Sequence, residues 1–116
     1  MSTAQDLVAA AKAGVKCLNA GDAAARVQEP GVLLLDLREP DEHEAGAVAG
    51  AVHIPRGVLE FKIGEVCDDR RREILLHCGG GGRASLAAQS LQSMGYENVR
   101  IVDAPFAEFA AACENY

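Results

Sequence analysis

The feature that most constrains this chain is a run of four glycines between a strand-like segment and a helix-like one. The run Gly79–Gly82 follows the apolar residues 74–76 and the pair His77-Cys78, and it precedes the alanine-rich residues 84–94. Short apolar runs are typical of buried strands, and the small residues after the loop recur on one face at helical spacing. We therefore predict a cysteine at the carboxyl end of a strand, facing the N-terminus of a helix.

This position indicates a functional role for Cys78. Four consecutive glycines cost chain entropy, but they let backbone amides turn inward without Cβ clashes. Converging amides and the helix dipole favour negative charge, so a Cys78 thiolate should be stabilised. A flexible linker and a small core cysteine are the alternatives. We favour the functional interpretation, because sites in parallel sheets lie beyond the carboxyl ends of the strands.

Length and composition fit one globular domain. The 116 residues are 49% hydrophobic and 24% charged, so we predict a single domain over residues 1–116, with residues 1–14 as an N-terminal helical extension. The net charge of −6 argues against nucleic acid or an anionic membrane as a partner. No apolar run approaches the ~18 residues of a membrane helix, and the first residues lack the features of a signal peptide. We expect a cytoplasmic protein.

Strand-like and helix-like segments alternate along the chain. Apolar runs predict strands at residues 15–18, 32–36, 51–54, 74–76 and 99–102, and helices are expected over residues 3–13, 19–27, 39–44, 57–63, 84–94 and from 103 onward. Residues 15–18 could also continue the first helix. We expect a capping box at Ser2 and Gln5, caps at Asn19 and Asp103, and a left-handed helix end at Gly95. The alternation implies an α/β domain with a parallel sheet.

The four cysteines show no metal or disulfide pattern. None is close to another in sequence, which fits neither a zinc ribbon nor a Cys-x-x-Cys pair. We expect free thiols, with Cys17 and Cys113 packed on apolar faces and Cys67 without a role in a charged turn. His43 and His53 have no ligand spacing either. We therefore expect neither a metal nor a cofactor.

Three blocks of the sequence form a recognisable pattern. One block is the loop, in which four residues separate Cys78 from Arg83. The other two are Leu35-Asp36-Leu37-Arg38-Glu39-Pro40-Asp41-Glu42 and Gly46-Ala47-Val48-Ala49-Gly50-Ala51-Val52-His53-Ile54-Pro55. In this order and spacing the blocks resemble the rhodanese (sulfurtransferase) family, and the resemblance extends from about residue 15 to residue 113.

The resemblance implies a three-layer fold of about five mainly parallel strands flanked by helices. It also implies a sulfurtransferase in which Cys78 carries sulfur as a persulfide, cradled by the backbone amides of Gly79, Gly80, Gly81, Gly82 and Arg83. The donor would be a small molecule such as thiosulfate, and the acceptor would be cyanide or a thiol on a small molecule or protein. Departures from the family pattern at His43, Ala47 and residues 103–106 concern packing and partner surfaces more than chemistry.

Four charged residues have candidate supporting roles. Arg83 could receive an anionic donor, or it could be a structural clamp on the loop or on an acidic neighbour. Asp36 could hold loop amides from below or accept a bond at its strand end. We expect Arg38 to pair with Glu42, and Arg56 either to line the mouth of the site or to be exposed. His77 should point to the opposite face of the sheet from Cys78, so we do not assign it as a general base.

Two other function classes remain open. A phosphatase or arsenate reductase of related architecture has five residues between its cysteine and arginine, and this loop has four. The count favours sulfur chemistry over phosphate chemistry. A non-catalytic sulfur-carrier or protein-binding module is the other alternative, and an intact Cys78 is compatible with a carrier role.

Overall fold

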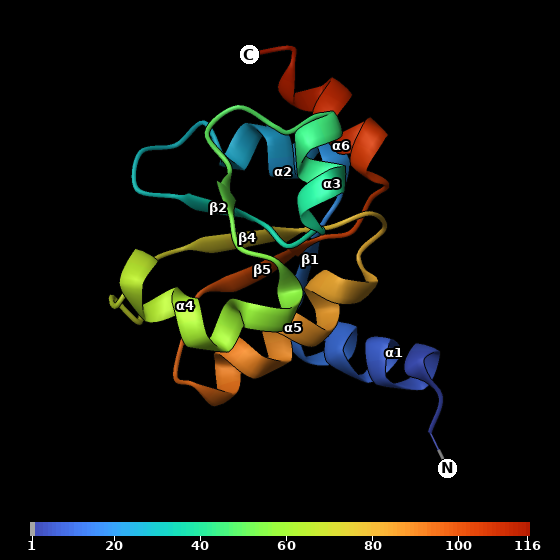
Figure 1. Cartoon of the computed structure of the whole chain (residues 1–116), viewed down its shortest axis with the longest axis vertical. Coiled ribbons are helices and arrows are strands. Elements are labelled where there is room, and N and C mark those ends of the chain that lie inside the picture. Colours follow the sequence, from blue (N-terminus) through green and yellow to red (C-terminus); the bar gives the residue numbers. More distant parts are fainter. Residues whose placement is uncertain (1) are drawn as a thin grey trace.

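A parallel sheet of five strands lies between two layers of helices in the computed structural model, which describes residues 2–116 (Figure 1). The strand order is β1-β5-β4-β2-β3, and every adjacent pair is parallel. In chain order the elements are α1 (Ala4–Gly14), β1 (Lys16–Leu18), α2 (Ala20–Arg26), β2 (Leu33–Asp36), α3 (Pro40–Ala45), β3 (Val52–His53), the 3-10 helix η1 (Arg56–Val58), α4 (Leu59–Val66), β4 (Ile74–His77), α5 (Gly82–Ser93), β5 (Val99–Val102) and α6 (Phe106–Cys113).

The central strands are apolar on both sides because helices cover both faces of the sheet. Along β2, Leu33 and Leu35 belong to the core cluster that includes residues of α4 and α5, whereas Leu34 belongs to the cluster that includes residues of α2 and α6. Figure 1 shows α4 and α5 on one side of the sheet and α2 and α6 on the other, and α1 packs on α5. The predicted fold class is therefore confirmed.

The helix ends follow the predicted chemistry at two of the four positions. Asn19 accepts the amide of Asp22 at 2.8 Å, and Gly95 ends α5 with a φ of 94°. The first capping box is one residue later than predicted. It consists of Thr3, whose hydroxyl accepts the Asp6 amide at 3.1 Å, and the Asp6 carboxylate, which accepts the Thr3 amide at 2.9 Å.

The predicted cap at Asp103 is wrong. The N-cap of α6 is Pro105, because the chain runs on for two residues after Asp103 before it turns into the helix. The Asp103 carboxylate instead accepts a hydrogen bond from Lys12 Nζ at 2.9 Å, which ties α1 to the end of β5.

Cys67 also differs from expectation, because it is buried in the core at the end of α4 rather than lying in a surface turn.

The topology brings the ends of β2 and β4 together. Asp36 and His77, the last residues of these neighbouring strands, are register partners. Residues 37–38 and Cys78 therefore leave the same edge of the sheet next to each other. No helix within residues 2–116 is long and apolar enough to cross a membrane.

Candidate active site

Cys78 lies where β4 ends and the glycine loop begins. Its side chain is 2% exposed and belongs to the core cluster beneath α5. The sulfur accepts hydrogen bonds from the amide of Gly81 at 3.1 Å and from the amide of Ala84 at 3.4 Å. The N-terminal turn of α5 is thus directed at Sγ, and both contacts favour negative charge on the sulfur.

Gly81 gives the loop its shape. Of the four glycines, Gly81 alone has a left-handed backbone, with a φ of 101°, and it is the N-cap of α5. Its carbonyl accepts the Ser85 amide at 2.9 Å, which closes the first turn of the helix. A Cβ at Gly81 would lie 3.2 Å from a carboxylate oxygen of Asp103, whereas one at Gly80 would meet open space. Only part of the glycine run is therefore required by backbone geometry.

The amides that bind the sulfur overlap with the predicted cradle at one residue. Gly81 lies within the predicted range of residues 79–83, but Ala84 lies beyond it. The first amides of a helix have no partner within the helix, and α5 begins at Gly82, so the amide of Ala84 is free to donate. A predicted helix that began at Gly82, two residues earlier than ours, would have identified the Ala84 amide as a free donor. Ligand binding by the other loop amides stays a prediction.

Arg83 forms a bidentate ion pair with Glu42 of α3. The nitrogens Nη1 and Nη2 donate to the two carboxylate oxygens at 2.6 and 3.1 Å. Hydrogen bonds from Arg83 and from the backbone amide of Glu39 lower the pKa of Glu42 to about 2. The pKa of Arg83 is raised, first by the hydrogen bond with Glu42 and also by the neighbouring Cys78. The pair is therefore charged and lies beside the cysteine.

The predicted pairing of Arg38 with Glu42 is wrong. Arg38 is 4% exposed and donates through Nε and Nη2 to the Asp36 carboxylate, each at 3.0 Å. Its guanidinium carbon lies 3.7 Å from the ring centroid of Phe106. A buried guanidinium needs a buried counter-charge, and Asp36, two residues earlier, is closer than the surface carboxylate of Glu42.

Asp36 holds side chains rather than loop amides. Its carboxylate accepts the backbone amide of Arg38 at 3.0 Å and bonds His43 Nδ1 at 2.8 Å. Burial alone would raise the pKa of Asp36, but the hydrogen bonds from Arg38 and His43 hold it well below its ordinary value. Of the two roles considered for Asp36, the contacts match the acceptor at its strand end and not the support of the loop amides. Asp36 is instead the centre of a buried network under α3.

Arg56 is tied to α4 and α5. It donates to both carboxylate oxygens of Glu60, at 3.0 and 2.9 Å, and its Nη2 lies 3.3 Å from Ser90 Oγ. Its side chain is 26% exposed and paired, so Arg56 is not the freely exposed arginine of one expectation, and its expected place at the site mouth stays a prediction. It joins α4 to the outer face of α5.

His77 lies on the opposite face of the sheet from Cys78, as predicted. Its ring packs against Phe106 and Phe109, with centroids 5.8 and 5.2 Å away. Neither ring nitrogen has a hydrogen-bond partner within the part of the chain that the structure describes. Burial lowers the pKa of His77 to about 4, although the nearby Asp36 carboxylate opposes the shift.

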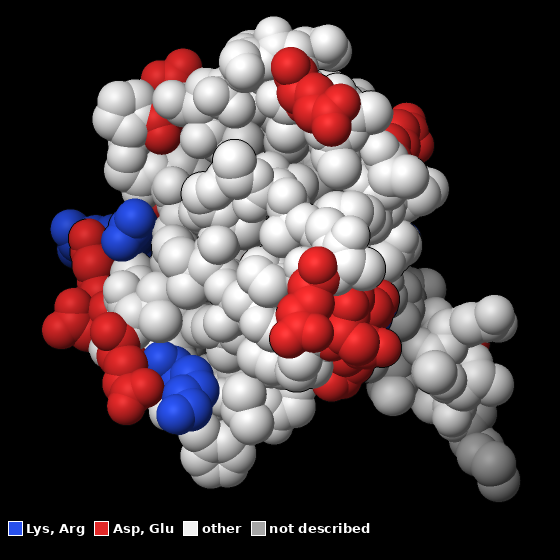
Figure 2. Space-filling model, turned by 45° about the horizontal axis from the view of Figure 1, so that its top comes forward, with Lys and Arg blue, Asp and Glu red and all other residues white. Residues whose placement is uncertain are grey.

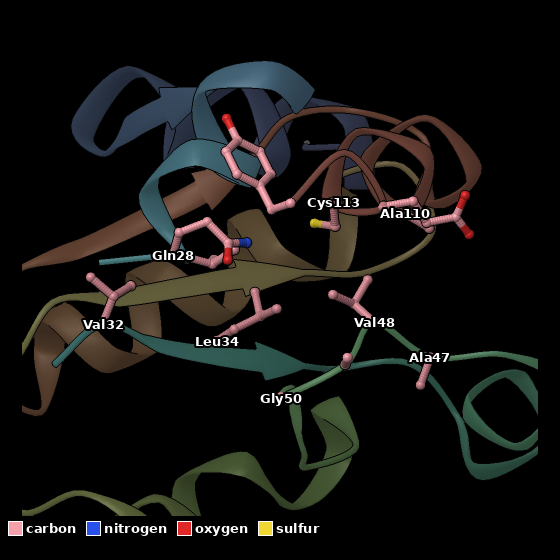
Figure 3. A pocket seen from close by; sticks show the side chains of 12 residues that line it. Gln28, Val32, Leu34, Ala47, Val48, Gly50, Ala110 and Cys113 are labelled. Carbon is pink, nitrogen blue, oxygen red and sulfur yellow. The ribbon is translucent and has the colours of Figure 1, made fainter. Parts of the chain in front are cut away.

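A hollow on the α2 and α6 side of the sheet is lined by another thiol. It has a volume of about 470 Å³, and Figure 3 shows Cys113 directed into it opposite Gln28 and Leu34. Burial raises the pKa of Cys113 and that of Cys17. Cys78 does not line this hollow, so the cavity and the loop are separate features.

Comparisons with known proteins find similar sequences and a family. The family model described as Rhodanese-like domain matches residues 19–112. Thiosulfate sulfurtransferase GlpE from Tolumonas auensis is 33% identical over 84 residues, which are 72% of this chain and 77% of that protein. YrkF from Bacillus subtilis, named as a candidate sulfur carrier protein, is 35% identical over 66 residues, or 57% of this chain. Those residues are 35% of YrkF, so this chain spans about a third of that relative.

A solved structure covers nearly the whole chain. It is that of a protein of unknown function from Rhodopseudomonas palustris, described as a possible tyrosine phosphatase. The TM-score is 0.86 with 27% identity, and the match covers 97% of this chain and 92% of the other.

Proposed function

The chain belongs to the rhodanese-like domain family, and from this premise we propose that it transfers sulfane sulfur through a persulfide on Cys78. The donor is a small sulfur compound, and the acceptor is cyanide or a thiol on a small molecule or protein. The observation that carries the proposal is the pair of amides, from Gly81 and Ala84, that donate to a buried Sγ.

The first half-reaction forms one sulfur–sulfur bond and breaks another. The Cys78 thiolate attacks the outer sulfur of the donor, and the rest of the donor leaves with the bonding electron pair. With thiosulfate the leaving group is sulfite, and the sulfur remains on Cys78 as a persulfide. The helix-terminal amides stabilise the negative charge before and after transfer, because they are already oriented toward the sulfur.

The second half-reaction returns the enzyme to its starting state. An acceptor thiolate or cyanide attacks the outer sulfur of the persulfide, and the Cys78 thiolate leaves. The Arg83 guanidinium lies over the residue that follows Cys78 and is paired with Glu42, so an anionic donor would approach this ion pair.

Intact mass tests the assignment of Cys78. Wild type and Cys78→Ser are incubated with thiosulfate, desalted and weighed. We expect the mass of one additional sulfur atom on the wild type, removed by cyanide, and none on Cys78→Ser. A sulfur adduct that persists on the serine variant would overturn the proposal.

The description of the Rhodopseudomonas palustris protein favours phosphatase activity as a second candidate. The same two variants are therefore assayed with p-nitrophenyl phosphate. Phosphate release that depends on Cys78, without a sulfur adduct, would replace the sulfurtransferase assignment.

The name of YrkF favours a sulfur-carrier role as a third candidate. A carrier would accept one sulfur atom and release it only to a specific partner protein. A transferase would turn over repeatedly with cyanide or a small thiol, and we expect such turnover.

A further inference from the structure

Each arginine near this edge of the sheet has a carboxylate partner. Arg38 pairs with Asp36 and Arg83 pairs with Glu42. Arg56, on the neighbouring turn, pairs with Glu60. The residues between Cys78 and Arg83 are glycines and contribute no charge. Arg83 is thus the cation nearest the reactive sulfur in sequence, and its charge is compensated.

The Glu42 carboxylate is held in place from two sides. The Glu39 amide donates to Glu42 Oε1 at 3.0 Å, as in a capping box, and Arg83 donates to both carboxylate oxygens. A Cβ at Gly79 would lie 2.8 Å from Nη2 of Arg83, so the guanidinium lies directly over the residue that follows Cys78. Releasing Arg83 toward a donor requires breaking both hydrogen bonds to a fixed carboxylate.

The surroundings of the pair are acidic. Figure 2 shows acidic side chains gathered over α3, and the helix and its cap contribute Glu39, Asp41, Glu42 and Glu44. The side chains of Arg83 and Glu42 are each 36% exposed, so an incoming donor experiences both charges with moderate solvent screening. A dianion therefore meets a neutral pair with further negative charge behind it.

We infer that Glu42 is a specificity-determining residue that cancels the charge of Arg83 and favours sulfur donors of low negative charge over the thiosulfate dianion. This inference rests on the proposed function, because it concerns the donor that loads Cys78. The donor class it favours carries at most one negative charge, as methanethiosulfonate does. The outer sulfur of such a donor bonds to the Cys78 thiolate, and the rest of the donor leaves with the electron pair, which for methanethiosulfonate is a sulfinate.

Glu42→Gln tests the inference directly. Glutamine has the same shape and can still accept the Glu39 amide, so α3 keeps its cap while Arg83 gains an uncompensated charge. The two donors are thiosulfate, a dianion, and methanethiosulfonate, a monoanion that transfers the same outer sulfur and releases a sulfinate. Glu44→Gln is the matched control, because it removes an exposed charge from the same helix without touching Arg83.

We expect kcat/KM to rise about five- to thirtyfold for thiosulfate and about two- to fivefold for methanethiosulfonate in Glu42→Gln, because the electrostatic energy scales with the charge of the donor. Glu44→Gln should change both values by less than about twofold. Equal changes for the two donors in Glu42→Gln, or an equal effect of Glu44→Gln, would overturn the inference.

The wild type provides a test that needs no variant. If the Arg83 charge is cancelled, raising the salt from about 20 mM to about 500 mM leaves kcat/KM for thiosulfate unchanged or raises it. A decrease of more than about twofold would indicate an uncompensated cation and contradict the inference. These outcomes are distinct from failure of the proposed function, in which neither donor loads sulfur on Cys78 in any variant.

Discussion

His77 Nε2 lies 4.0 Å from Oδ1 of Asp36, its register partner on the adjacent strand. The two groups are almost fully buried, yet the distance is too long for a hydrogen bond. The carboxylate is instead used by Arg38 and His43. Among the residues that the structure describes, the buried imidazole of His77 therefore has no hydrogen-bond partner, and its environment favours the neutral ring.

We predict that His77 makes the fold sensitive to acid. Its pKa is about 4 in the folded chain and about 6.5 in the unfolded chain, so the unfolded state binds the extra proton between these values. Protonation of His77 in the unfolded chain should therefore lower the free energy of unfolding by about 3 kcal/mol as the pH drops from about 6.5 to about 4. His77→Leu should remove this part of the acid dependence.

Urea unfolding of wild type and His77→Leu at several pH values measures the effect. The two curves should run close together above about pH 7 and separate below about pH 6, with the variant more stable. A constant difference at every pH would show that the His77 proton plays no part.

We predict opposite outcomes for two adjacent glycines. Gly81→Val should abolish transfer, because a branched side chain disfavours a φ of 101° and its Cβ would crowd Asp103. Gly80→Ala should retain at least about a third of wild-type turnover, because its Cβ would meet open space and its backbone is not left-handed. Steady-state transfer to cyanide, with circular dichroism as a check on folding, compares them. Equal loss in both variants would mean that the whole glycine run, and not Gly81, supplies the geometry.

For Arg83→Ala we predict a loss of about tenfold to a hundredfold in kcat/KM with thiosulfate. The substitution removes the cation and leaves Glu42 as an unpaired negative charge beside the donor. The loss should be smaller with methanethiosulfonate, and adding Glu42→Gln to Arg83→Ala should restore part of it. Arg83→Lys should recover part of the charge but not the bidentate geometry. An equal loss with both donors would assign Arg83 to holding the loop.

Asp36→Asn should destabilise the fold by about 3–5 kcal/mol, because it leaves the buried guanidinium of Arg38 without a counter-charge. Asp41→Asn, an exposed change on α3, is the control and should have an effect within about 0.5 kcal/mol. Thermal unfolding measures both. Similar melting temperatures for the two variants would show that the Asp36–Arg38 pair contributes little to stability.

The local sequence determined the fold class of this protein and the positions of Cys78 and His77 in it. The unbroken apolar runs at residues 33–35 and 74–76 favour strands that are buried on both faces, as in a parallel sheet between helices. The position of Cys78 follows from the same pattern, because a strand, a glycine run and a helix in succession place it at an edge of the sheet beside helix amides. Alternation along β4 likewise put His77 on the far face.

Only the tertiary structure decided which charges meet. Spacing in the sequence favoured a local pair between Arg38 and Glu42, but Arg38 points into the protein, where Asp36 is its buried counter-charge. Glu42 is then free to pair with Arg83, 41 residues away, because the parallel order of β2 and β4 brings α3 beside the cysteine loop. Which ion pairs form depends on burial and on distances between side chains in the folded protein. The spacing of residues along the chain does not give either quantity. The sequence therefore identified Arg83 as the arginine beside Cys78 and allowed it an acidic neighbour, but only the tertiary structure identified that neighbour as Glu42.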